Sequence, residues 1–195
     1  MYLPTRISLT TSDGRRDTNS HILLNVKPPP ATLKLKIDPP KEGAMGQTIK
    51  NTVTGQTIVK PDPVDEEVPF DGGVMITETD RYGIITYANK KFREMTGYTK
   101  EELIGSPHNI NRHPDMPKAA FREMWRTIKN GEYWEGYVKN MRKDGKYYLV
   151  VVWIKPKFDQ DGKIVGYIAG RKIPDKEKMQ KALELYKQMK AEEEK

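Results

Sequence analysis

The sequence contains no cysteine, and this absence removes several classes of function at once. Without thiols the chain can form no disulfide, no cysteine-ligated zinc site, no iron–sulfur cluster and no cysteine nucleophile. Light-driven chemistry in which a thiol adds to a bound cofactor is excluded as well. Chemistry in this protein must therefore use nitrogen and oxygen side chains or a bound cofactor.

Long apolar runs are also missing. No stretch is apolar enough to cross a bilayer, and the N-terminus lacks the basic start and apolar core of a signal peptide. These features predict a cytoplasmic location and no direct membrane insertion. The net charge is +7, from 34 basic and 27 acidic residues, but the two signs are interleaved along the chain. We therefore predict no nucleic-acid partner, and an anionic cofactor would explain a local excess of positive charge equally well.

Residues 1–69 differ in composition from the rest of the 195-residue chain. Prolines interrupt this segment repeatedly and long apolar side chains are sparse, so it can bury little surface. We predict a largely disordered N-terminal extension that is dispensable, up to about residue 65, for any cofactor site. Two local exceptions are a short strand at 33–37 and a loose hairpin where Gly-Gln-Thr-Ile occurs at 46–49 and again at 55–58.

Residues 70–175 have the periodicities of a folded α+β domain, with two strands, then helices, then three strands. Asn89 and Thr99 stand where helix N-caps belong, and glycines follow the predicted helix ends. The predicted strands are 74–79, 84–87, 133–141, 146–155 and 163–171, and the predicted helices are 90–96, a short one after Thr99, and 118–130.

The stretch from Ser106 to Trp134 concentrates the residues that could bind a cofactor. It holds two of the three histidines and two of the three tryptophans, and Arg112, His113 and Asp115 fall within four positions. Prolines stiffen this loop. Beyond it, the apolar side chains of 118–130 recur at helical spacing. Such a site suits a flat aromatic ligand with a charged tail, with its rings against Trp and its phosphates against Arg and His.

Each of these residues also has a structural explanation. Asp115 is a residue type that commonly caps a helix, a Trp on an apolar helix face is usually part of the core, and a loop His is often only locally bonded. On the strand 133–141, alternation directs Trp134 and Asn140 inward together. A buried amide needs partners, so Asn140 contacts either neighbouring backbone or a cofactor. For Asn89 the helix cap is the stronger interpretation.

Four segments carry a resemblance to a known family: TDRYGIITYANKKFREMTGYTKEELIG, PHNINRHPDMPKAAFREMW, WEGYVKNMRKDGKYY and GKIVGYIAGRK. Together they resemble a PAS domain, and specifically the flavin-binding PAS domain of aerotaxis receptors. The first segment is common to PAS domains in general, whereas the run from Pro107 to Trp125 is specific to the aerotaxis branch. The overall layout is similar to stand-alone PAS proteins of energy taxis.

The resemblance implies a PAS fold, with five antiparallel strands and helices on one face, and FAD held between them. It implies a redox or energy sensor, without enzymatic turnover, that signals to a separate membrane chemoreceptor and so associates with it; a homodimer is also expected. Asn111 and Leu149 depart from the family pattern and put the detailed shape of the pocket in doubt. The cofactor-binding positions that it implies are Asn89, His108, Arg112, His113, Asp115, Phe121, Trp125, Trp134 and Asn140.

Residues 176–195 form a predicted amphipathic helix, with Met179, Leu183, Tyr186 and Met189 along one side. At this length the helix needs something to pack against, either its own domain or a partner.

Two alternatives to the flavin sensor stay open. One is a PAS module that binds haem through His108 or His113, another small molecule, or no cofactor. The other is a metal enzyme that uses His108, His113 and Asp115, which Arg112 disfavours because a cation beside the ligands opposes metal binding.

Overall fold

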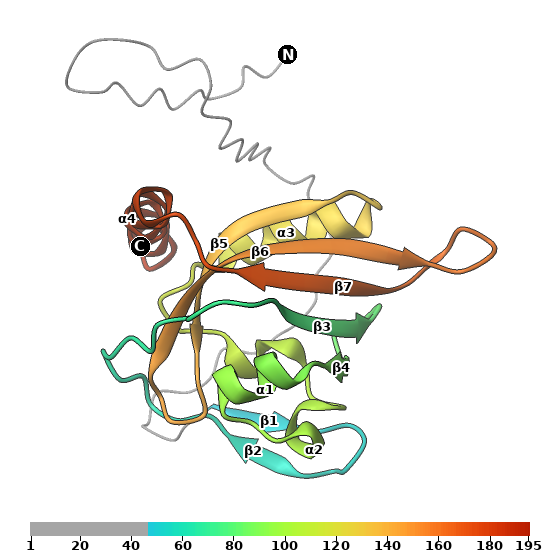
Figure 1. Cartoon of the computed structure of the whole chain (residues 1–195). Helices are drawn as coiled ribbons and strands as arrows, with labels where there is room; N and C mark the ends of the chain where they lie inside the picture. The colour runs from blue at the N-terminus through green and yellow to red at the C-terminus, as the bar shows by residue number, and fades with distance from the viewer. Residues whose placement is uncertain (1–46) are drawn as a thin grey trace, which may run out of the picture. The chain divides into compact units, whose positions relative to one another are not determined.

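The computed structural model describes residues 47–195, which contain a five-stranded antiparallel sheet in the order β4-β3-β7-β6-β5 (Figure 1). Helices connect β4 to β5, and α4 follows β7. The strands are β3 (Met75–Asp80), β4 (Ile85–Ala88), β5 (Trp134–Met141), β6 (Tyr147–Phe158) and β7 (Ile164–Lys172). The helices are α1 (Lys90–Thr96), α2 (Lys100–Leu103), the 3₁₀ helix η1 (His108–Asn111), α3 (Lys118–Lys129) and α4 (Lys176–Glu193).

The local signals in the sequence are confirmed between residues 70 and 195. Asn89 caps α1, and Gly97 ends it with a φ of 75° that favours glycine. Thr99 and Glu102 form a full capping box at α2, in which each side chain bonds to the other residue's backbone N–H. The predicted strands and helices all occur within a few residues of their expected limits; η1 is the element that periodicity did not predict.

The core lies between the sheet and the helices α1, α2, η1 and α3. Alternation along β5 buries Trp134, Val138 and Asn140 on one face, as predicted. The antiparallel register pairs Asn140 with Tyr148 on β6, so the polar and apolar inward side chains form rows across the sheet. The helices complete this core with Phe92, Leu103, Ile110 and Ile128.

Residues 47–69 differ from the predicted disordered extension. The hairpin expected from the repeated Gly-Gln-Thr-Ile is confirmed: strands β1 (Thr48–Lys50) and β2 (Thr57–Val59) pair antiparallel, and Ile49 and Ile58 join the core. The backbone of Val68 then bonds to Tyr147 at the start of β6. Composition averaged over the whole segment concealed these few well-placed apolar side chains. The predicted strand 33–37 lies outside the described residues.

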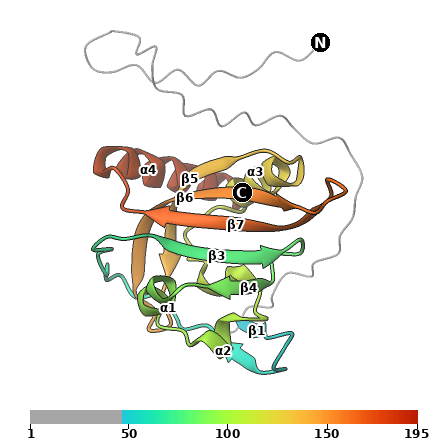
Figure 2. The ribbon, with the colours of Figure 1, turned by 45° about the vertical axis from the view of Figure 1, so that its right-hand side comes forward.

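Helix α4 packs on its own domain, beside β5 and α3 (Figures 1 and 2). Met179, Ala182 and Tyr186 are buried, and the Tyr186 hydroxyl donates to the carbonyl of Tyr137 at 2.8 Å. Since β5 ends the sheet, this bond satisfies a carbonyl on its otherwise open edge.

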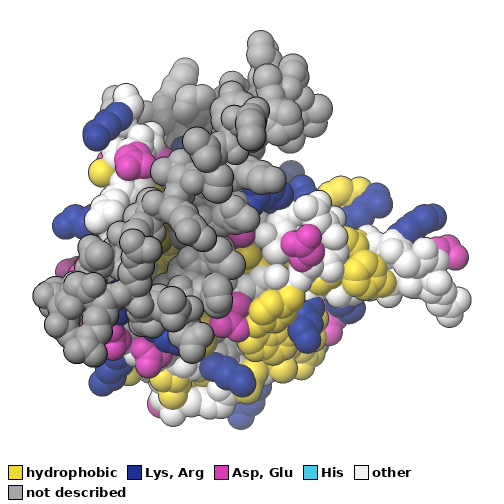
Figure 3. Space-filling view, turned by 90° about the horizontal axis from the view of Figure 1, so that it is seen from above, with side chains coloured by type: hydrophobic (Ala, Val, Ile, Leu, Met, Phe, Trp, Pro, Cys, Tyr) yellow, Lys and Arg dark blue, Asp and Glu magenta, His cyan; other side chains and the backbone are white. Residues whose placement is uncertain are grey.

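The surface matches the interleaved charges of the sequence. On the face seen in Figure 3, basic and acidic side chains are interspersed rather than gathered in one patch. Among residues 47–195 no helix combines the length and apolar character needed to span a bilayer.

Candidate functional site

The candidate site is built around η1 and the loop that follows it. Ile110 anchors η1 because it is fully buried in the core. The Asn111 amide donates to the Tyr148 hydroxyl at 3.1 Å, and the backbone of Arg112 forms an isolated bridge with Asn140 on β5. The loop is thus fixed to the inward face of the sheet at two neighbouring points.

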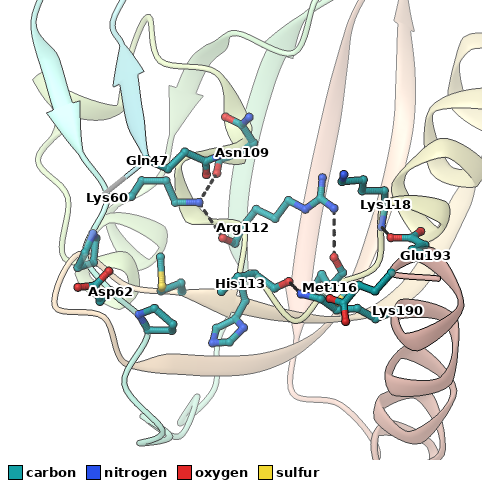
Figure 4. A pocket seen from close by; sticks show the side chains of 15 residues that line it. Gln47, Lys60, Asp62, Asn109, Arg112, His113, Met116, Lys118, Lys190 and Glu193 are labelled. Atoms are coloured by element: carbon teal, nitrogen blue, oxygen red, sulfur yellow. Dashed lines mark hydrogen bonds between the residues drawn. The ribbon is translucent and has the colours of Figure 1, made fainter. Parts of the chain in front are cut away.

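A cavity of about 540 Å³ lies beside this loop (Figure 4). Arg112 is central to it: its guanidinium donates to the carbonyl of Met116 at 3.1 Å and lies 4.0 Å from the centre of the Phe121 ring. Burial lowers the pKa of Arg112 from its ordinary value. The other ionisable side chains on the cavity wall are Lys60, Asp62, His113, Lys118, Lys190, Glu193 and Glu194.

His113 and Asp115 lie in the same loop but have different environments. His113 is 3% exposed, and its Nδ1 accepts a hydrogen bond from the backbone N–H of Asp115 at 3.1 Å. Burial, together with the nearby charge of Lys139, lowers the pKa of His113 to about 4, so the ring is neutral at pH 7. The Asp115 carboxylate points outward and accepts from Lys139 at 2.8 Å.

Asp115 does not cap α3, the role considered for it from the sequence; another residue accepts the free N–H groups of that helix. Pro117 occupies the N-cap position of α3 and makes no side-chain capping bond. Instead the Glu193 carboxylate of α4 accepts from the backbone N–H groups of Lys118 at 3.0 Å and Ala119 at 2.6 Å. A residue from the last turn of the last helix therefore satisfies the first turn of α3.

His108 belongs to a second polar cluster with Arg171 and Thr77, in which Arg171 and Thr77 are buried and His108 is half-buried. Arg171 donates to His108 Nε2 at 2.8 Å and to Thr77 Oγ1 at 3.0 Å, and its Nε has no partner. Burial and the charge of Arg171 lower the pKa of His108 to about 3, so His108 is a neutral acceptor. Burial lowers the pKa of Arg171 to about 10, which leaves the guanidinium charged at pH 7.

Arg171 was not among the predicted site residues. Its side chain lies on the inward face of β7, in line with Tyr167 and Ala169, and is only 2% exposed. In the described part of the chain no carboxylate pairs with it. A basic residue on the apolar side of an alternating strand was the signal in the sequence that could have identified it.

Asn140 joins the loop to the sheet. It is 6% exposed, and its side chain hydrogen-bonds to the Tyr148 hydroxyl, which also accepts from Asn111. The partner is a side-chain hydroxyl and not the neighbouring backbone that the sequence offered as one interpretation; the cofactor contact stays a prediction. The position of Asn140 still adjoins the Arg112 loop through the backbone bridge.

The remaining predicted residues are less closely associated with this loop. Asn89 uses its amide at the start of α1, where the oxygen accepts from Phe92 and Ile76 and the nitrogen donates to Val74. Trp125 packs edge-on against Tyr167, 5.5 Å between ring centres. Trp134 donates its indole N–H to Glu123 of α3 at 2.6 Å. The two tryptophans thus serve packing contacts here, whereas Phe121 supports Arg112.

The donor set of the site fits a flavin nucleotide better than a metal. Arg112, on the cavity wall, offers a cation for phosphates. In the second cluster, outside the cavity lining, the orphaned Arg171 Nε is a buried donor that lacks an acceptor. Ring oxygens and nitrogens of a flavin are acceptors of that kind. Within residues 47–195 no group of three or more His, Asp or Glu side chains is arranged to hold a metal ion.

Residues 85–169 match the family described as the PAS fold. The chain is 46% identical over 121 residues to the aerotaxis receptor of Escherichia coli strain K12. The matched region is 62% of this chain and 24% of that protein. It is 33% identical over 96 residues to the nitrogen fixation regulatory protein of Klebsiella pneumoniae, covering 49% of this chain and 19% of that one. The chain therefore spans about a quarter or less of each of these relatives.

Solved structures agree on the fold. The light-state structure of the blue-light photoreceptor Aureochrome1 LOV superposes with a TM-score of 0.52 at 20% identity, covering 57% of this chain and 89% of that one. A light-oxygen-voltage domain studied with a flavin analogue has a TM-score of 0.51 at 22% identity, covering 64% of this chain and 90% of that one. At such identities these likenesses concern the arrangement of helices and strands.

Proposed function

Since residues 85–169 of this chain belong to the PAS-fold family, we propose that the protein is a flavin-binding sensor whose cofactor is FAD. The observation that carries the proposal is a buried cation without a counter-charge. Arg171 keeps its charge at neutral pH but has only His108, Thr77 and a backbone carbonyl as acceptors. An isolated buried charge is costly, so such a group is expected to meet a ligand acceptor.

The residues divide into two roles in this proposal. Arg112, supported by Phe121, would hold the phosphates, and Arg171 and Asn140 would face the polar edge of the ring. When bound, a flavin supplies reversible electron transfer that changes the protonation of its ring. An amide carries a donor and an acceptor at its two ends, so Asn140 could serve either protonation state by rotating.

Haem on His108 has less support. Its Nε2, the nitrogen that would bind iron, faces the Arg171 guanidinium at 2.8 Å. A cation at this distance opposes metal binding at the same nitrogen.

We further propose that the output is energy taxis through a membrane chemoreceptor, without enzymatic turnover. The support is the 46% identity to an aerotaxis receptor, of which this chain spans 24%. Helix α4 is the element placed to report the state of the site, because it contacts both the edge of β5 and the Arg112 loop. A change at Asn140 would reach α4 through β5.

The test of the flavin is the absorbance spectrum of the purified full chain. We expect non-covalent FAD, with blue and near-ultraviolet bands and no Soret band. Arg112→Ala should weaken FAD roughly 10- to 150-fold, since a charge-assisted hydrogen bond contributes roughly 1.5–3 kcal/mol. Arg81→Ala, in the exposed turn after β3, removes the same charge elsewhere and should bind normally. Colourless protein that does not take up added FAD would exclude a flavin sensor.

The signalling proposal needs a separate measurement in cells. Asn140→Ser keeps a donor and an acceptor but shortens the side chain, so it should retain flavin and lose redox-dependent taxis. Flavin content of the purified variant is the control for a binding defect. Unchanged taxis in this variant would rule out the amide as the coupling group, whatever its contact with the cofactor.

A further inference from the structure

The β1–β2 hairpin forms hydrogen bonds with the segment Ile104–Ser106, which precedes η1. Asn51 is fully buried, and its amide donates to the carbonyl of Ile104 at 2.8 Å and to the Ser106 hydroxyl at 3.2 Å. The backbone N–H of Thr52 donates to the carbonyl of Gly105 at 2.7 Å. This segment is followed closely by His108, the first residue of η1, so the hairpin holds the N-terminal end of η1 in place.

Lys60, just after β2, fixes the other end. It is 5% exposed, and its ammonium donates to the carbonyl of Arg112 at 2.8 Å and to that of Asn109 at 3.1 Å (Figure 4). The Asn109 carbonyl also accepts the backbone N–H of Arg112 at 3.0 Å, so the ammonium adds a second donor there and is a side-chain donor to the Arg112 carbonyl just after the turn. Asn51 and Lys60 therefore hold η1 from both sides.

Stabilisation of the hairpin alone does not explain why the buried residue beside Arg112 is Lys60, a second cation. Burial and the positive charge of Arg112 lower the pKa of Lys60 to about 8, so the contact places two like charges near one another. In the part of the chain that the structure describes, no carboxylate forms an ion pair with either cation, although the charge of Glu193 on the same cavity wall partly opposes the lowering of the pKa of Arg112. Both cations line the same cavity, where a bound anion would relieve their repulsion.

We propose that the β1–β2 hairpin is part of the cofactor site and that Lys60 is a positioning residue, which holds the Arg112 turn in the conformation that receives the phosphates of the dinucleotide. This inference rests on the proposed FAD function. It extends the site to a hairpin that lies before residues 85–169, the part matched by the PAS family. It thereby opposes the prediction from the sequence that residues up to about 65 are dispensable for the cofactor. Because Lys60 would act through Arg112, replacing Lys60 should no longer change FAD affinity once Arg112 is absent.

The experiment is a double-mutant cycle in the full chain, with Lys60→Met, Arg112→Ala and the double variant titrated with FAD and with riboflavin, which has no phosphate. We expect Lys60→Met to weaken FAD about 10-fold and riboflavin by less than about twofold. In the Arg112→Ala background the same substitution should weaken FAD by less than about twofold. Lys60→Arg, which keeps the charge and donors, should restore most of the affinity.

Lys50→Met is the matched control, since it removes a charge from an exposed position on the same hairpin and should bind FAD normally. If Lys60→Met does not fold, as judged by circular dichroism, Lys60→Gln takes its place in the cycle because it keeps one donor. Additive effects of the two substitutions, equal losses for FAD and riboflavin, or unchanged FAD affinity would each overturn the positioning role. Failure of the unaltered protein to bind either flavin would instead overturn the proposed function, and this inference with it.

Discussion

Arg171 shows, at the scale of one residue, how a site and the stability of the protein can conflict. The buried guanidinium stacks 4.9 Å above the Phe92 ring and bonds to neutral groups only. Its desolvation is therefore poorly offset in the flavin-free protein. The same charge is what would attract an electron-rich ligand edge.

Arg171→Met should consequently stabilise the flavin-free protein while weakening flavin binding. Methionine fills similar space, and Thr77 and His108 remain 3.1 Å apart, so they can bond to each other. We expect the free energy of unfolding of flavin-free protein to rise by about 1–3 kcal/mol and FAD affinity to fall by about tenfold or more. Urea unfolding and FAD titration measure the two effects.

Lys172→Met, at the exposed neighbouring position of β7, is the control for charge removal on that strand. If Arg171→Met destabilised the flavin-free protein, the guanidinium would be a structural group with sufficient partners, and its assignment to the ligand would lose its basis.

At the scale of elements, α4 and α3 depend on each other through Glu193. The carboxylate satisfies two backbone N–H groups at the start of α3 and lies 3.8 Å from Arg122. It also carries negative charge to a helix N-terminus, where such charge is stabilising. The end of α4 is therefore held by the same helix that borders the candidate site.

Glu193→Ala should release the last turns of α4. A lost capping interaction costs about 1 kcal/mol, so amide hydrogen exchange in α4 should accelerate about fivefold. Glu192→Ala, at an exposed neighbouring position, should leave exchange unchanged. Equal protection in the two variants would mean that Met179, Ala182 and Tyr186 hold the helix without the Glu193 contact.

At the scale of the whole molecule, the two histidines of lowered pKa predict how the free energy of unfolding depends on pH. The pKa of His108 is lowered to about 3 and that of His113 to about 4, both mainly by burial, from an ordinary value of 6.5. The unfolded chain therefore binds protons below pH 6.5 that the folded protein does not. Stability is complete above that pH and declines as the pH falls from 6.5 toward 4, by up to about 1.4 kcal/mol per pH unit for each histidine.

Urea unfolding between pH 7.5 and 5.5 measures this decline above the range where most carboxylates titrate. His108→Asn and His113→Asn should each reduce the slope, whatever their effect on stability at pH 7.5. The third histidine, His21, lies outside the described residues and provides a matched control, His21→Asn, with an unchanged slope expected. Equal slopes in all the proteins would mean that the two histidines are not held neutral by the fold.

The sequence by itself determined the parts of this protein that depend on local chemistry. Asn89, Thr99 and Gly97 set helix limits through backbone bonds and a left-handed φ, which need no distant partner. Alternation along β5 likewise decided that Trp134 and Asn140 face inward. The short-range pattern around Arg112, His113 and Asp115 was enough to locate the loop that borders the cavity.

Only the tertiary structure decided which distant residues meet there. Lys60 and Arg112 are 52 positions apart, Arg171 and His108 are 63 apart, and Glu193 and Lys118 are 75 apart. No local periodicity encodes such contacts, because they arise when strands pair and the core closes. The contacts of Lys60 and Glu193, the residues with the least local signal, are therefore defined only by the folded structure.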